Sequence, residues 1–502
     1  MYTKEYVEAT DGVRFPGKSF QDAILEPVFD VQKQYLYRPF IKISKAHLVM
    51  LQEQQIITPD EARAIMQGLL EVETIDFESR RYDPSYEDMF FMVENALADK
   101  VGIDLAGRMH IARSRNDLDI CEFRMVLREK VLEIIGLLNT FREVLLNLAA
   151  ENIDTVMPAY THTQPAQPST LAHYLLAFHD SIARDCGRLM NAYHTINHSP
   201  IGAAAITTTG FPINRERMGE LLGFDGLVEN SYDCIAGCDY LTECASALMI
   251  CNTNLSKFMK DVLDFCTREF NAFYLSAPYV QISSIMPQKR NPSSLEHTRP
   301  MISKAIAEAN AVFTVLHNTP FGDIVDTEEQ LQPHLYDSIE YTARVLKVVC
   351  AVLVTLKVNK KVLFDRAHEG FITATELCDT LVREKGLSFR LSHKVTSALV
   401  RQLIDRRMAI ADITTELIDA IAADTIGQRL GISDQIIRAA LDPVHFVAIR
   451  TVTGGPAPGE VRRMLAKRNA ALETERAACE DCRARLRTAD AALADAIAAL
   501  LK

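Results

Sequence analysis

A helical periodicity that extends over three long segments constrains the fold more than any other feature. From Leu118 to Asn152, apolar side chains recur at steps of three and four residues, as on one face of an amphipathic helix. The segments Tyr240 to Phe270 and Ser338 to Lys360 repeat this pattern, and the first half of the former carries only one charge. Helices of this length form bundles. Strand signals are few and short, so the sequence predicts an all-α protein with a long central bundle.

Proline, glycine and polar clusters divide this helical chain. We expect an amino-terminal helical domain over residues 1–113, a central bundle domain over 114–365, a carboxy-terminal helical domain over 366–465 and an appended helix over 466–502. The last segment is rich in alanine and alternating charge, as in a solvated helix. The nearly uncharged stretches of the central helices predict that subunits bury them against each other.

Composition excludes several classes of protein. The 502 residues carry a net charge of −12, which argues against a general binder of nucleic acid or anionic membranes, because such binders need a basic face. No segment has the apolar length of a membrane span, and the opening MYTKEYVEATDGVRF lacks the apolar run of a signal peptide. We therefore expect a soluble, cytoplasmic protein.

The cysteines predict neither a disulfide framework nor a metal site. There are eleven, an odd number without paired spacing, which is typical of reduced thiols. Cys479 and Cys482 form a lone C-x-x-C inside a charged helical pattern, with no second pair. We interpret them as surface thiols of a helix rather than as a redox or zinc site.

Three distant segments combine small hydrogen-bonding and cationic residues beside long helices. In the first, GRMHIARSRNDLD, the residues Ser114, Arg115 and Asn116 precede the first long helix. The free N–H groups and the dipole of a helix amino terminus favour an anion, so this segment is suited to holding a carboxylate. The alternative is that Ser114 or Asn116 is only a helix cap.

The second segment, AYTHTQPAQPSTLAHY, places Thr161 and His162 directly before a proline-containing stretch. The prolines exclude a regular helix there and predict a rigid, polar corner. A lone histidine is more often structural than catalytic, so this segment alone leaves both roles open for His162.

The third segment, ISSIMPQKRNPSSLEHTRP, sets two serines beside cations. An unperturbed hydroxyl is a very weak base, so Ser283 or Ser284 could abstract a proton only if cations and backbone donors stabilised its alkoxide. Lys289 and Asn291 could supply that stabilisation. They would also stabilise a carboxylate that gains a second negative charge when its neighbouring carbon is deprotonated. The alternative is a solvated connection between helices.

The third segment resembles the signature G-S-S-x-M-P-x-K-x-N of the aspartase/fumarase superfamily. The segments GRMHIARSRNDL, YTHTQPAQP, GFITATELCDTLVREKGLSFR and LDPVHFVAIRTVTGGPAP resemble, in the same order, those of its argininosuccinate lyase branch. The resemblance covers roughly residues 10–465. It implies a homotetramer whose central helices merge into one bundle, with each active site built by loops from three subunits and with no metal or organic cofactor.

The resemblance also implies a reaction, the reversible β-elimination of fumarate from an N-substituted aspartate by a carbon–nitrogen lyase. In this motif Ser283 matches the general base, and the resulting aci-carboxylate is held by Ser284, Lys289 and Asn291. The implied ligands of the fumarate end are Ser114, Arg115, Asn116 and Thr161. His162 matches a histidine that pairs with a glutamate, here Glu296, and that helps to protonate the leaving amine.

Two departures from the family pattern concern loop closure and the amine half of the substrate. Ile282 replaces the glycine before the serine pair, which predicts a stiffer loop. The segments AILEPVFDVQKQYLYRPF and FGDIVDTEEQ differ from those that grip arginine in the family. The second supplies four carboxylates, Asp323, Asp326, Glu328 and Glu329. A cationic amine therefore fits, whether arginine, another amino acid or a diamine as in ethylenediamine-disuccinate lyases.

Two other functions stay open. One is a non-catalytic structural or binding protein on the same fold, as in lens crystallins, because fold does not determine function. Retention of the whole reactive set argues against it. The other is a carbon–oxygen lyase of the fumarase type, for which water rather than an amine would leave. The residues SRND in the first segment resemble those of argininosuccinate lyases, which favours an amine as the leaving group.

Overall fold

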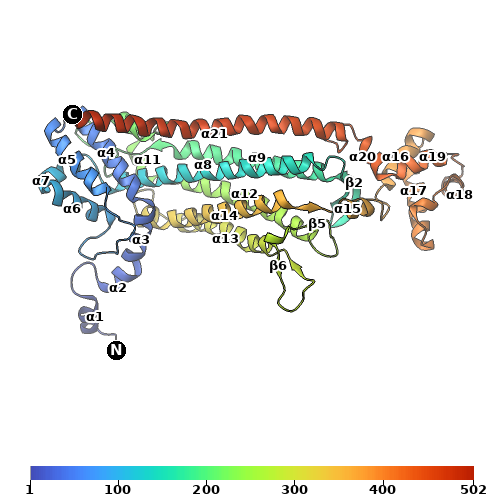
Figure 1. Cartoon of the computed structure of the whole chain (residues 1–502), viewed down its shortest axis with the longest axis horizontal. Helices are drawn as coiled ribbons and strands as arrows, with labels where there is room; N and C mark the ends of the chain where they lie inside the picture. Colours follow the sequence, from blue (N-terminus) through green and yellow to red (C-terminus); the bar gives the residue numbers. More distant parts are fainter. Residues whose placement is uncertain (1) are drawn as a thin grey trace.

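Six helices of 24 residues or more in the described chain lie side by side along the length of the molecule (Figure 1). The computed structural model describes residues 2–502. The six are α8 (Arg115–Ala150), α9 (Leu171–Ile196), α12 (Asp239–Phe265), α13 (Ser293–Leu316), α14 (Gln332–Thr355) and α21 (Pro458–Leu500). Within α8 the apolar side chains recur at three and four residues and are buried in the bundle, and each such burial contributes about 1.5–3 kcal/mol. The predicted all-α class with a long central bundle is confirmed.

The three helices predicted from periodicity exist with shifted ends. They correspond to α8, α12 and α14. The last ends at Thr355, before the predicted Lys360, because Leu356 is extended and the next two residues pair with a distant strand. No helix within residues 2–502 is both long enough and apolar enough to span a membrane.

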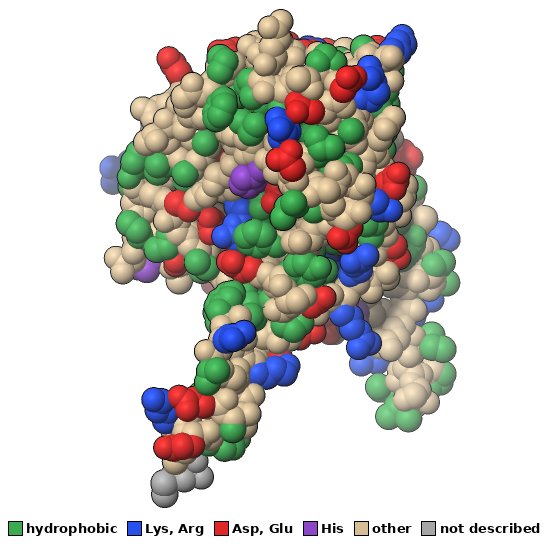
Figure 2. Space-filling model, turned by 90° about the vertical axis from the view of Figure 1, so that its left-hand side faces the viewer, with side chains coloured by type: hydrophobic (Ala, Val, Ile, Leu, Met, Phe, Trp, Pro, Cys, Tyr) green, Lys and Arg blue, Asp and Glu red, His purple; other side chains and the backbone are tan. Residues whose placement is uncertain are grey.

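Short helices form the amino-terminal end of the molecule. They are α1 (Lys4–Asp11), α2 (Lys18–Phe20), η1 (Gln21–Leu25), α3 (Glu26–Tyr35), α4 (Tyr37–Glu53), α5 (Pro59–Glu73), α6 (Met89–Val101) and α7 (Ile103–Met109). Helix α1 has no buried residue, and it projects from the body as an arm (Figures 1 and 2). Figure 2 shows acidic and basic side chains interspersed on this face. Helices α3 to α7 enclose an apolar core that the start of α8, helix α10 and the end of α21 also join.

Another group of short helices forms the opposite end (Figure 1). They are α15 (Lys360–Ala367), α16 (Ala374–Lys385), α17 (Phe389–Arg406), η4 (Ile410–Asp412), α18 (Thr415–Ile426), α19 (Asp434–Leu441) and α20 (Pro443–Ala448). A separate apolar core lies among α16 to α19. The division at residues 113, 365 and 465 remains a proposal, which the separate core of α16 to α19 supports for the carboxy-terminal domain, although α21 itself begins at Pro458.

The remaining elements are short and connect the long helices. The helices are α10 (Arg215–Leu222), α11 (Ser231–Ala236), η2 (Ala277–Tyr279) and η3 (Asp326–Gln330). The strands are β1 (Val156–Thr161), β2 (Gln164–Thr170), β3 (His198–Ser199), β4 (Gly226–Leu227), β5 (Phe273–Tyr274), β6 (Gln281–Ile282), β7 (Arg290–Asn291) and β8 (Lys357–Val358). Strands β1 and β2, β5 and β8, and β6 and β7 pair antiparallel, whereas β3 and β4 pair parallel.

Helix α21 covers one face of the bundle rather than standing free. It packs along α8 and reaches α4 and α10 near its end (Figure 1). Leu472, Cys479, Cys482 and Leu486 of α21 are buried in the bundle core. The interpretation of Cys479 and Cys482 as surface thiols is therefore wrong, since they are only 2% and 4% exposed. Burial raises the pKa of both thiols, which keeps them protonated and unreactive.

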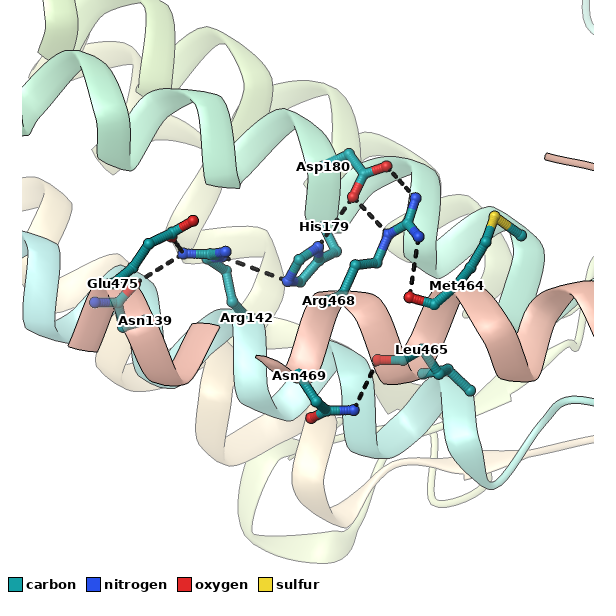
Figure 3. Close-up of polar contacts among 9 residues, drawn as sticks. All are labelled: Asn139, Arg142, His179, Asp180, Met464, Leu465, Arg468, Asn469 and Glu475. Atoms are coloured by element: carbon teal, nitrogen blue, oxygen red, sulfur yellow. Dashed lines mark hydrogen bonds and ion pairs between the residues drawn. The ribbon is translucent and has the colours of Figure 1, made fainter. Parts of the chain in front are cut away.

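A polar network joins α21 to α8 and α9 (Figure 3). The buried guanidinium of Arg142 donates to Asn139 Oδ1 at 3.0 Å and to His179 Nε2 at 3.4 Å, and it pairs with Glu475 of α21. Arg468 of α21 donates through Nε to Asp180 Oδ1 at 2.6 Å. Burial lowers the pKa of His179, so its neutral ring accepts from Arg142 at Nε2 and donates to Asp180 from Nδ1. The network sets the register of α21 on the bundle.

We expect Arg142→Met to lower the free energy of unfolding by about 2 kcal/mol, because buried acceptors on Asn139 and His179 lose their donor. Urea unfolding at a fixed protein concentration measures the change. Glu475→Gln is the matched control, since Glu475 is half exposed and its amide oxygen still accepts, so that variant is expected to lose less than about 1 kcal/mol. Equal losses in the two variants would contradict the buried role of Arg142.

Candidate active site

The first predicted segment forms the amino terminus of α8. Ser114 precedes the helix with extended backbone, and its N–H donates to Asp117 Oδ1 at 3.0 Å. The other carboxylate oxygen of Asp117 accepts from the N–H groups of Gly202 and Ala204. Burial raises the pKa of Asp117 to about 6 despite these donors. The Ser114 hydroxyl instead donates to Asn116 Oδ1 at 2.6 Å, so it does not cap the helix with its side chain.

Arg115 and Asn116 connect this helix end to acidic neighbours. Arg115 donates to Asp88 Oδ2 at 2.6 Å and to Glu87 Oε1 at 3.2 Å. Burial by itself would lower the pKa of Arg115, but these two carboxylates raise it. Asn116 donates from its amide nitrogen to Asp323, which lies before η3. The first segment therefore contacts the acidic loop that the sequence assigned to the amine half.

The second predicted segment is the β1–β2 hairpin. His162 and Thr163 form its two-residue tip with φ of +49° and +63°. Both values lie in the left-handed region, which costs roughly 1–2 kcal/mol for each residue that is not glycine. Thr161 and His162 are exposed there. A two-residue hairpin with a primed turn requires positive φ at both tip residues, so this geometry leaves both roles open for His162.

The third predicted segment is a loop between β6 and β7 that projects from the side of the bundle (Figure 1). Ser283 Oγ accepts from the N–H of Met286 at 3.1 Å and from that of Ile285 at 3.4 Å. Ser284 and Lys289 are exposed, Asn291 is half-buried in β7, and Glu296 is exposed in the first turn of α13. The loop thus holds the Ser283 hydroxyl, two backbone donors to it and the cationic side chain of Lys289.

Within one chain the three segments remain separate. Figure 1 places the start of α8, the β1–β2 hairpin and the β6–β7 loop at different positions along the molecule. Nothing in residues 2–502 pairs His162 with Glu296 by an ion pair. The predicted site residues therefore form three clusters: Ser114 with Arg115 and Asn116, then Thr161 with His162, then Ser283 with Ser284, Lys289, Asn291 and Glu296.

Ile282 fits its position without strain. It lies in β6, opposite Arg290 of β7, so its backbone is extended rather than in the left-handed region that favours glycine. Its side chain is 76% exposed. A stiffer loop remains a prediction.

The two altered segments line one cavity of about 190 Å³. The amino-terminal segment contributes an apolar wall that includes Ile24, Pro27 and Val28. The other wall comes from η3 and α14 and contains Glu328, Glu329, Gln332, Pro333 and Tyr336. The sequence analysis missed Gln332 and Tyr336. Their spacing of four residues, directly after an acidic loop, is a signal that places both on one helix face.

Carboxylates dominate the electrostatics of this cavity. Burial and a hydrogen bond with Asp323 raise the pKa of Glu328 to about 8. Burial, followed by the charge of Asp88, raises the pKa of Glu329. Arg115 opposes both shifts, but it is already held by Asp88 and Glu87. The cavity can therefore stabilise an additional positive charge.

Comparison with known proteins extends over nearly the whole chain. A family model described as lyase matches residues 21–307, and one described as argininosuccinate lyase C-terminal matches residues 371–448. The chain is 41% identical over 420 residues to argininosuccinate lyase of Methanocaldococcus jannaschii, with 84% of this chain and 85% of that protein covered. It is 36% identical over 458 residues to argininosuccinate lyase 2 of Agrobacterium fabrum, with 91% of each chain covered.

Solved structures agree with this relationship. An EDDS lyase variant with bound fumarate is 33% identical, with a TM-score of 0.86 and 99% of each chain covered. A class II fumarase from Schistosoma mansoni, at 14% identity and a TM-score of 0.66 over 84% of this chain and 91% of that one, shares the fold alone. Because one family model covers more than half of the residues and close relatives span most of them, the chain belongs to the argininosuccinate lyase branch of the aspartase/fumarase superfamily and is a carbon–nitrogen lyase.

Proposed function

We propose that this protein catalyses the reversible β-elimination of fumarate from an N-substituted aspartate, such as argininosuccinate or an N-(aminoalkyl)aspartate. The observation that carries the proposal is the environment of Ser283. Its Oγ accepts from two backbone N–H groups, and Lys289 stands on the same loop. Hydrogen bonds to a charged form favour that form, so this loop is suited to an alkoxide base.

The mechanism follows from the charges on this loop. Ser283 removes the proton from the carbon beside a carboxylate, and the carboxylate becomes an aci-carboxylate dianion. Lys289 supplies the positive charge that this dianion needs, while Ser284 and Asn291 donate hydrogen bonds to it. The pair of electrons then forms the carbon–carbon double bond of fumarate and expels the amine, which His162 helps to protonate. Ser114, Arg115, Asn116 and Thr161 hold the fumarate end.

Each active site combines segments of different copies in a homotetramer. The separation of the three segments in one chain supports this, because the start of α8, the β1–β2 hairpin and the β6–β7 loop lie at different positions along the molecule (Figure 1). The contact of His162 with Glu296 would then join two copies.

Ultraviolet absorbance of fumarate tests the proposed function. The purified protein is mixed with argininosuccinate, other N-substituted aspartates and malate. We expect fumarate from at least one N-substituted aspartate, with the rate proportional to enzyme concentration. Fumarate from malate alone would establish the carbon–oxygen lyase instead. Absence of fumarate with every compound would favour a non-catalytic protein.

A further inference from the structure

We propose that the cavity between the amino-terminal segment and η3 binds the leaving amine and selects amines that carry a second positive charge and no carboxylate. This inference rests on the proposed function, because it names the substrate class of the same site. The cavity is the one lined by Ile24, Pro27, Val28, Glu328, Glu329, Gln332 and Tyr336. We call it the amine cavity.

The wall of the amine cavity contains two residues whose buried polar atoms lack a hydrogen-bond partner in the described chain. The amide nitrogen of Gln332 donates to Thr327 O at 2.7 Å, which leaves its Oε1 without a partner in the described chain. The hydroxyl of Tyr336 also has no partner there. Both residues are only 2% exposed, so water does not readily satisfy them. A buried acceptor without a donor is destabilising, so a ligand with N–H groups fits this wall.

The charge of the cavity points to the same ligand. Glu328 and Glu329 belong to its wall, and no lysine or arginine does among the described residues. Asp119 of α8, a half-buried acidic group, is affected by the same charges: burial and then the charges of Asp88, Glu328 and Glu329 raise its pKa. An ammonium or guanidinium group in the cavity would offset the repulsion among these acidic groups. A carboxylate on the ligand would increase it, with no cation in the wall to compensate.

The cavity lies next to the fumarate-end ligands. Asn116 donates to Asp323, and Asp323 is hydrogen-bonded to Glu328 of the cavity wall. An amine attached to the succinyl group would thus extend from Asn116 toward Glu328. The opposite wall of Ile24, Pro27 and Val28 contacts an aliphatic stem, as apolar surfaces do for the methylene groups of long cationic chains.

Matched amines test the selection in the direction of addition, in which fumarate absorbance falls. Agmatine is arginine without its carboxylate, and 1,4-diaminobutane is ornithine without its carboxylate. We expect kcat/KM to be about 10–100-fold higher for the member of each pair that lacks the carboxylate. Glu329→Gln is expected to reduce this preference severalfold. Glu340→Gln, the same change at an exposed site farther along α14, is the matched control and should leave the preference unchanged.

The outcomes separate the two proposals. Fumarate consumption with arginine or ornithine at an equal or higher kcat/KM would overturn the selection and leave the lyase function standing. Absence of turnover with every amine and every N-substituted aspartate would overturn the function. In that case calorimetry with agmatine alone decides: binding that is weakened by Glu329→Gln but not by Glu340→Gln supports the amine cavity, and absence of binding overturns it.

Discussion

Ser283→Ala is expected to lower kcat for fumarate release by about 10²–10⁴-fold, because the only proposed base on the loop loses its oxygen. The hydroxyl receives two backbone N–H groups, so its removal also leaves those donors free to water on an exposed loop rather than disturbing a core. The fold and the fumarate-end ligands stay intact, and KM is expected to change much less than kcat. Steady-state kinetics by fumarate absorbance measure both constants.

An exposed serine of α13 provides the control for this loss. Ser303 is exposed, and its hydroxyl bonds only to a carbonyl of its own helix, Arg299 O at 3.2 Å. Ser303→Ala is expected to retain the full rate. If Ser283→Ala kept more than about a tenth of kcat, Ser283 would not be the base, since that loss is far below what removal of a general base causes.

Mixing two inactive variants should restore activity. Ser283→Ala and His162→Asn each disable one cluster, and the two clusters lie apart in a single chain. If a site takes Ser283 from one copy and His162 from another, random exchange in equal amounts leaves about a quarter of the sites with both residues intact. The expected rate of the mixture is therefore a substantial fraction of that of the unaltered protein, against almost none for either variant alone.

The mixing experiment needs proof that subunits exchange. Native mass spectrometry of one tagged and one untagged variant shows whether mixed oligomers form. Each variant incubated alone under the same conditions measures the residual rate. Mixed oligomers without recovery of fumarate release would contradict sites shared between copies, and a monomer in solution would do so as well.

Much of the fold could be predicted because helix formation depends on local pattern. The apolar repeat of residues 118–152 corresponds to α8, and the segment from Tyr240 corresponds to α12. The β1–β2 hairpin could not be predicted, because its second strand, QPAQPST, lacks the alternation and branched residues of a typical strand. Its prolines excluded a helix, and only the pairing with Val156–Thr161 determined that the corner is a hairpin.

The candidate site, too, could be predicted only in part from the sequence. Motif and spacing identified Ser283, Lys289 and Asn291, which one loop holds together. The burial of Cys479 and Cys482 was predicted wrongly, because the charged pattern of α21 resembles a solvated helix while its narrow apolar stripe contacts α8. Gln332 and Tyr336 were missed because their spacing places them on one helix face but does not show that this face is buried beside a cavity.

The sequence by itself determined the helical class, the long bundle and the residues suited to carbanion chemistry, since these depend on periodicity and on the chemical nature of neighbouring side chains. Only the tertiary structure decided that two altered segments, some 300 residues apart, enclose one acidic cavity, and that the reactive segments lie apart in one chain. The physical reason is that a cavity and its unpaired acceptors arise from packing between distant elements, which local sequence does not encode.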